Sequence, residues 1–300
     1  MANYASFSTM KTNVGNLLHD TGATMGGFIG VWLNECYSEI SRQTIWSSLI
    51  NWDYTFESVA DTATYDLPED FGQELFLANI AKGEMLERFR EGRWWHERHS
   101  AYQSDSIGSA VPRNYIILPG ESNLGKIQLD PPPLDAETYA LPYQRIAWNM
   151  LTTTGTCTTN TENKIIAAAS TFITSGVKPG MRVKNTTDNT YEFISTVDSN
   201  TQLTMADDLC PDGNEEFAVN AECLITDAQY ILEAYACAMG WAYQEEFNKS
   251  NWYMEKFNRL LAKRVGEERR KVNQMFQRVS GPYRIRGAYR FSGDSSYDTI

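Results

Sequence analysis

The spacing of apolar and polar residues predicts a helix near the start of the chain. Between residues 24 and 49, apolar side chains recur every three or four positions, with charged and polar residues between them. This spacing is typical of an amphipathic helix with one buried face. Gly22, Gly26 and Gly27 are expected to form a flexible segment that leads into this helix.

The same helical spacing returns near the end of the chain. No proline occurs between Asp227 and Gly281, and apolar residues again recur every three or four positions. Asp227 is expected to cap the first helix of this region. The polar residues 248–251 predict a break, and hence two helices rather than one.

Between the helical ends, the pattern changes to the alternation of β-strands. Residues 54–68 are rich in aromatic and β-branched side chains and predict a hairpin with its turn at 61–64. Further strands are expected at 113–118, 126–129 and 138–148, separated by glycine and proline.

A threonine-rich connector from Leu151 marks a boundary. Strands are expected after it near 181–185, 191–197 and 201–205, separated by short, regular turns, and this β-pattern continues to about Leu224. We therefore expect a discontinuous main domain, 1–150 plus 224–300, and an inserted all-β module, 151–223. The expected fold class is α+β: a helical bundle with a small antiparallel β-sheet, plus an inserted small β-barrel or sandwich module.

Composition narrows the class of protein. Of the 300 residues, 42% are hydrophobic and 21% are charged, as in ordinary globular domains. No apolar run approaches the roughly 18 residues of a membrane span, and the first residues do not resemble a signal peptide. Five scattered cysteines without a C-x-x-C pair predict free thiols in a reducing compartment.

Candidate catalytic motifs are incomplete. Residues 120–126 match G-x-x-x-x-G-K, but Ile127 replaces the required Ser or Thr, and a strand pattern follows instead of a helix. His96 and His99 are one residue closer than in a zinc-protease helix, and no third ligand is suggested nearby. We assign no catalytic, cofactor-binding or metal-binding residue. With 38 acidic residues, a carboxylate pair for glycan hydrolysis stays open.

The charge is unevenly distributed. The net charge is −12, which argues against DNA binding through the overall field. Residues 251–290, however, contain eleven Lys/Arg and three acids, a balance of +8 that leaves −20 for the rest. This basic helix and the following arginine–tyrosine tail, about 280–300, predict docking onto an acidic partner or contact with nucleic acid. Trp94 and Trp95 are the best candidates for an exposed aromatic interface.

Several segments resemble those of a known family. The segments are 33–40 and 46–49, the strand and loop 65–71, the strand and proline triplet 127–133, and the alanine-rich helix 234–242, followed by the basic final helix. Together, over about 1–150 and 224–280, they resemble tailed-phage head-to-tail adaptor proteins, also called head-completion connectors or portal adaptors.

The resemblance implies a structural virion protein without enzymatic activity. Such adaptors form a ring, usually of twelve copies, beneath the portal protein at the head–tail junction. The other face of the ring receives the next tail component, a nozzle or tail tube protein. Genomic DNA passes through the lumen without sequence-specific binding, and no membrane is involved. The chain would be made in the host cytoplasm. The residues expected to dock onto the portal are Tyr283, Arg284, Arg286, Tyr289, Arg290 and Phe291, and Trp94 and Trp95 would contact the tail protein or a neighbouring subunit.

Two other functions stay open at this point. One is a virion-associated peptidoglycan hydrolase. The other is a nucleic-acid-binding module that uses the basic C-terminal helix.

Overall fold

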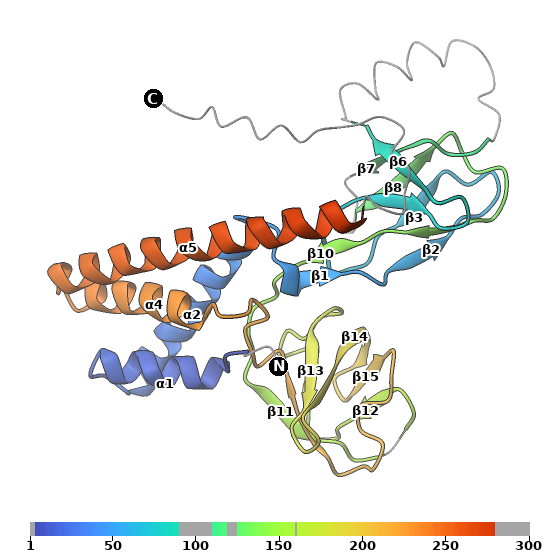
Figure 1. Cartoon of the computed structure of the whole chain (residues 1–300). Coiled ribbons are helices and arrows are strands. Elements are labelled where there is room, and N and C mark those ends of the chain that lie inside the picture. Colours follow the sequence, from blue (N-terminus) through green and yellow to red (C-terminus); the bar gives the residue numbers. More distant parts are fainter. Residues whose placement is uncertain (1–3, 90–109, 119–124, 160, 280–300) are drawn as a thin grey trace, which may run out of the picture.

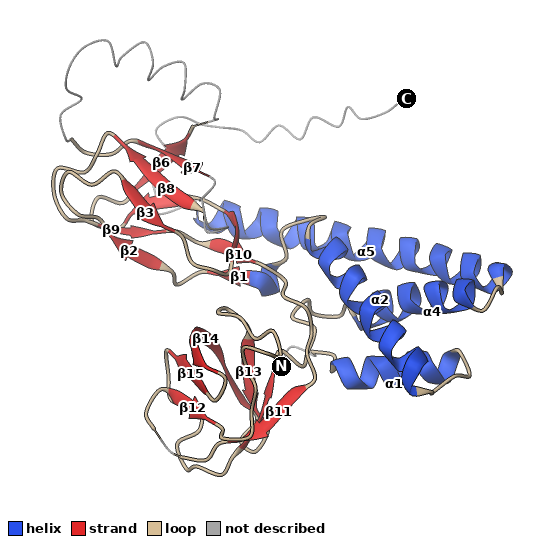
Figure 2. Cartoon of the chain, turned by 180° about the vertical axis from the view of Figure 1, so that it is seen from behind, coloured by secondary structure: helices blue, strands red, loops and turns tan. Residues whose placement is uncertain are grey.

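The computed structural model describes residues 4–89, 110–118, 125–159 and 161–279. The α-helices in this part are α1 (Phe7–Leu17), α2 (Ala23–Ser41), α4 (Gln229–Tyr243) and α5 (Phe247–Val279), with a short 3-10 helix, η1 (Ser47–Leu49). Helices and sheets occupy separate regions of the molecule (Figure 2). This arrangement confirms the α+β class.

The helices from the two ends of the chain share one hydrophobic core. Met10 of α1, Leu33 of α2 and Leu232 of α4 are fully buried, and Leu261 of α5 is nearly so. α5 lies along α4 and then continues past it toward the β-strands (Figure 1). At 1.5 Å per residue, its 33 residues span about 50 Å.

Outside residues 151–223, the strands form two sheets. The seven-stranded sheet has the order β2-β9-β5-β6-β7-β8-β3, and the three-stranded sheet has the order β1-β10-β4. All neighbours are antiparallel except β6 and β7. The strands of these two sheets are β1 (Ile50–Asn51), β2 (Thr55–Glu57), β3 (Thr64–Asp66), β4 (Phe71–Glu74), β5 (Leu77–Asn79), β6 (Glu84–Arg88), β7 (Asn114–Leu118), β8 (Lys126–Asp130), β9 (Thr138–Ala140) and β10 (Tyr143–Arg145).

The seven-stranded sheet curls so that its two edge strands approach each other. The rings of Phe56 on β2 and Tyr65 on β3 have centroids 5.2 Å apart. The Tyr65 hydroxyl also accepts a hydrogen bond from the backbone N–H of Val59 at 3.0 Å. The curled sheet encloses its own core around Leu77, Leu129 and other apolar residues.

Residues 153–219 form a third, six-stranded antiparallel sheet of order β11-β16-β13-β14-β15-β12. Its strands are β11 (Thr153–Thr156), β12 (Lys164–Ile166), β13 (Arg182–Asn185), β14 (Thr190–Ser199), β15 (Gln202–Met205) and β16 (Glu216–Val219). The sheet has a separate core that includes Phe172, Leu203 and Phe217, each at most 1% exposed. The strands expected near 181–185, 191–197 and 201–205 are all present.

Several predicted elements differ from the observed ones. The hairpin at 54–68 is wrong: β2 pairs with β9, and β3 pairs with β8, at opposite edges of one sheet. The β-structure outside 151–223 is also larger than the small sheet that was expected. The supposed threonine-rich connector contains β11.

The helix boundaries differ too. The first predicted helix ends at Ser41 rather than Leu49, and Gly26 and Gly27 lie inside it rather than before it. α1 has no counterpart among the predicted helices. Asp227 does not cap α4, whose N-cap is Ala228. The break between α4 and α5 falls at residues 244–246, where Glu245 adopts a φ of 62°, and α5 runs without interruption through residues 248–251.

Among the described helices, none is long and apolar enough to cross a membrane.

Candidate interaction surfaces

The residues predicted to dock onto a partner lie outside the described residues. This holds for Trp94 and Trp95, which follow β6, and for Tyr283, Arg284, Arg286, Tyr289, Arg290 and Phe291, which follow α5. The described surfaces nearest to these segments in sequence are therefore the most informative. The C-terminal half of α5 is the first of them.

α5 has one buried face and one basic face. Phe257, Leu261 and Val265 are buried against the helical core. On the opposite side, Trp252, Lys256, Arg259, Lys263 and Arg270 recur at intervals of three, four or seven residues, which places them in one stripe along the helix. We call these five residues the α5 stripe. Trp252 is 57% exposed, and the ammonium group of Lys256 lies 5.5 Å from its ring centroid.

One basic residue of α5 is structural rather than free for docking. Arg264 is only 7% exposed, and its Nη2 lies 3.0 Å from Oε1 of Glu268. The same Nη2 donates to the carbonyl oxygen and to Oγ1 of Thr226, each at 3.0 Å. The positive balance of residues 251–290 therefore overstates the charge that α5 presents to a partner.

Glu268 connects α5 to the segment after α2. Ser47 donates to Oε2 of Glu268 from its hydroxyl at 2.7 Å and from its backbone N–H at 3.2 Å, and Lys271 donates to Oε1 at 2.9 Å. Burial opposes ionisation, but these hydrogen bonds and the charge of Arg264 outweigh it and lower the pKa of Glu268. These contacts, together with those of Arg264, fix the part of α5 that lies beyond α4.

A second exposed stripe runs along α2. Phe28 and Val31 are 40% and 53% exposed, and Glu35 and Glu39 are exposed one and two turns further on. We call these four residues the α2 stripe. Phe28 also packs against Tyr243 at the end of α4, with ring centroids 5.2 Å apart. Val31, Glu35 and Glu39 line a groove whose lining also includes Phe7 and Lys11 of α1 and residues 149–152.

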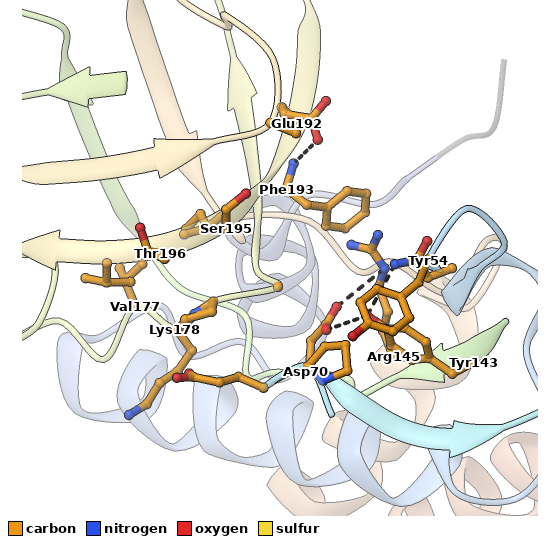
Figure 3. Close-up of a pocket in the computed structure, with 18 of the residues that line it drawn as sticks. Tyr54, Asp70, Tyr143, Arg145, Val177, Lys178, Glu192, Phe193, Ser195 and Thr196 are labelled. Atoms are coloured by element: carbon orange, nitrogen blue, oxygen red, sulfur yellow. Dashed lines mark hydrogen bonds and ion pairs between the residues drawn. The ribbon is translucent and has the colours of Figure 1, made fainter. Parts of the chain in front are cut away.

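A cleft separates the six-stranded sheet from the rest of the β-structure (Figure 3). On one wall, the Tyr143 hydroxyl donates to Oδ1 of Asp70 at 2.6 Å, and Nε of Arg145 lies 3.6 Å from Oδ2. Burial, together with the charge and hydrogen bond of Asp70, raises the pKa of Tyr143. The guanidinium of Arg145 stacks on Phe193 of the opposite wall, 3.5 Å from the ring centroid. This cation–π contact crosses between the two β-regions.

Two further contacts hold the six-stranded sheet in place. Gly180 has a φ of 78° and packs so closely on Asp70 that a Cβ atom there would overlap the Asp70 side chain. Nε1 of Trp148 donates to the carbonyl oxygen of Pro179 at 3.1 Å. Asp70, Tyr143 and Arg145 thus take part in the contacts between the β-regions, and we assign no catalytic role to them.

The structure describes part of the candidate motifs. Lys126 begins strand β8 rather than a helix, so the G-x-x-x-x-G-K match lacks the helix N-terminus that binds phosphate. His96 and His99 lie outside the described residues. Among the described residues, no group of three or more His, Cys, Asp or Glu is arranged to hold a metal ion. All five cysteines are buried free thiols.

Sequence reasoning identified the basic character of α5 but missed the α2 stripe. The signal for the stripe was present: Phe28, Val31, Glu35 and Glu39 share one face at helical spacing. Phe28 and Val31 are also among the apolar residues whose spacing predicts the buried face of this helix. Their exposure depends on how α2 packs, which the spacing alone does not give.

The described surfaces thus comprise two exposed helix stripes and a cleft crossed by structural contacts. Comparison with protein families gives the class of protein. The family model of the SU10 adaptor protein, a phage head–tail adaptor family, matches residues 5–177, more than half of the chain. The chain belongs to this family and is therefore a structural phage adaptor and a virion component. No curated protein matches the chain.

Proposed function

We propose that the chain forms a ring beneath the portal protein and joins the portal to the next tail component, a nozzle or tail tube protein. The ring contains twelve copies and surrounds a channel for DNA. Membership of the adaptor family supports a connecting role between head and tail components. The ring, its stoichiometry and its partners go beyond what the family match establishes.

The observation that carries this proposal is the position of α5. The helix is held along α4 by its apolar face and fixed near its C-terminal end by Arg264 and Glu268. A helix fixed in this way gives a defined point from which the chain continues into residues 280–300. In this proposal Tyr283, Arg284, Arg286, Tyr289, Arg290 and Phe291 dock onto the portal, since such aromatic and arginine residues are common anchors of protein interfaces.

The charge distribution supports the channel. Without residues 251–290, the chain carries a balance of −20. An acidic lumen repels DNA and lets it pass without sticking. As part of this proposal, we retain the division into a discontinuous main domain, 1–150 and 224–300, and an inserted module, 151–223. We also retain Trp94 and Trp95 as a contact to the tail protein or a neighbouring subunit.

Electron microscopy of the full chain mixed with the portal protein of the same phage tests the proposal. We expect a ring capping the portal. Truncation after Gly281 should abolish binding while leaving the circular dichroism spectrum and the unfolding transition unchanged. A truncated chain that binds as well as the full chain would refute the assignment of the tail. A full chain that never forms a ring on the portal would refute the function itself.

Nucleic-acid binding is a second candidate because the α5 stripe presents Lys256, Arg259, Lys263 and Arg270 on one face. A filter-binding assay of the full chain with duplex DNA distinguishes the two. An acidic connector should bind weakly at all salt concentrations. A DNA-binding module should bind tightly at low salt, with affinity falling steeply as salt rises.

A further inference from the structure

Two exposed stripes of this molecule complement each other in charge. The α2 stripe carries Glu35 and Glu39, and the α5 stripe carries Arg259 and Lys263. Within the part of the chain that the structure describes, none of these four side chains has an ion-pair partner. Each stripe lies on the far side of its helix from the buried face, so the two cannot meet within one chain.

The spacing of the two stripes is also the same. In α2, Glu35 and Glu39 follow Phe28 by seven and eleven residues; in α5, Arg259 and Lys263 follow Trp252 by the same intervals. At 1.5 Å per residue, the two charged residues of each stripe lie about 10.5 Å and about 16.5 Å along the helix axis from the aromatic residue of that stripe. Two parallel helices in this register bring apolar groups together at one end and opposite charges together at the other.

We propose that α2 of one copy packs in parallel against α5 of the next copy, with Trp252 against Phe28 and Val31, Arg259 against Glu35, and Lys263 against Glu39. The proposal rests on the ring described above and assigns its subunit contact. It extends the function because neither the family match nor the fold identifies which surfaces of neighbouring copies meet.

The groove beside α2 supports a second copy as the occupant. Val31, Glu35 and Glu39 line the groove together with Phe7 and Lys11 of α1 and residues 149–152, so α2 borders a recess rather than a flat face. Gly27 lies in its lining, and no atom lies within 4 Å of the position that a Cβ would occupy there, which leaves room for side chains of a docked helix. The exposed Trp252 on α5 is the residue type most often found as the anchor of an interface.

Geometry also favours contact between different surfaces of identical chains. Because the acidic and basic stripes are on different helices, the contact is head-to-tail, the type that closes into a ring. A two-fold contact through either stripe would instead place like charges opposite each other, which costs several kcal/mol.

Sedimentation equilibrium of the full chain over a range of concentrations tests this contact. Glu35→Lys/Glu39→Lys reverses the α2 stripe, and Arg259→Glu/Lys263→Glu reverses the α5 stripe. Each double variant should self-associate at least about 100-fold more weakly than the unmodified chain, since two attractive pairs become repulsive. Mixing the two variants in equal amounts should restore association. When the variants alternate, the reversed α2 stripe of one meets the reversed α5 stripe of the other, and the two original stripes meet in the next contact, so every contact again joins opposite charges.

The control variant is Lys126→Glu/Lys178→Glu. It makes the same change in net charge as the α5 reversal but at exposed positions in the β-regions, and it should associate like the unmodified chain. Circular dichroism verifies that all variants fold.

Three results would overturn the proposed contact. The first is unchanged association of both double variants, and the second is failure of the mixture to recover. A full chain that stays monomeric at every concentration would also overturn it. These results differ from a failure of the proposed function, which would be the absence of a ring on the portal in electron micrographs.

Discussion

Arg264 and Glu268 form an ion pair one helical turn apart on α5, and both side chains are almost completely buried. Each is also tied to another segment: Arg264 to Thr226, before α4, and Glu268 to Ser47, after α2. The pair thus joins three segments that are distant in sequence. The orientation of α5 depends on this small group of polar contacts.

Replacing Glu268 should destabilise the fold. Glu268→Gln removes the charge that Arg264 and Lys271 face and leaves Arg264 buried without its main counter-ion. We expect the free energy of unfolding in urea to fall by about 2 kcal/mol. Glu267→Gln is the matched control, because Glu267 is a more exposed partner of Arg264 and its loss should change the stability by less than about 0.5 kcal/mol. Equal effects of both changes would contradict the structural role of Glu268.

The stabilisation by Glu268 should depend on pH with a defined sign. Its folded-state pKa is below the ordinary value of about 4.3, so the folded protein binds a proton less readily than the unfolded chain. The contribution is therefore present in full above the ordinary pKa and is lost as the pH falls through the folded-state pKa. We expect urea titrations to show the stability gap between the unmodified chain and Glu268→Gln narrowing as the pH falls from about 6 to about 3. A gap that stays constant over this range would contradict the prediction.

The sequence predicted strands well where pairing is local and poorly where it is not. β13, β14 and β15 follow one another along the chain and pair in that order, so alternation and turn residues were enough to find them. β2 instead pairs with β9, about 80 residues later, and the turn near Asp61 connects two opposite edges of the sheet. Local turn residues cannot distinguish these two arrangements.

Local sequence patterns were also insufficient to predict where the helices break and which of their side chains are exposed. The polar residues 248–251 suggested a break, but they lie in the first turns of α5, and the chain reverses earlier, at the positive φ of Glu245. The sequence showed that α5 is basic, yet it could not separate the buried Arg264 from the exposed Arg259 and Lys263. That separation depends on Thr226 and Ser47, which come close to α5 only through packing.

The cysteines should be unreactive in the folded protein. Burial raises the pKa of Cys223 and of Cys237 to about 12, and it raises the pKa of Cys36 as well, so these thiols do not ionise near pH 8. Cys157 and Cys210 are fully buried too. A colorimetric thiol reagent at pH 8 should therefore label the native chain slowly and should label five thiols per chain in guanidinium. Rapid labelling of any thiol in the native state would contradict the burial.

A methyl group at Gly180 should loosen the contact between the six-stranded sheet and the rest of the molecule. Gly180→Ala combines an unfavourable positive φ with overlap between the new Cβ and the Asp70 side chain. Gly176→Ala is the matched control: its φ of 77° is almost the same, but no atom lies within 4 Å of the new Cβ. We expect the control to cost about 1 kcal/mol, from backbone strain alone, and Gly180→Ala to cost at least about 2 kcal/mol more. Because Asp70 also holds Tyr143 and Arg145, the displaced carboxylate should increase protease cleavage between residues 146 and 152 in the first variant only. Equal losses of stability in the two variants would show that Asp70 moves aside at no cost, and that the close approach of Gly180 does not hold the two β-regions together.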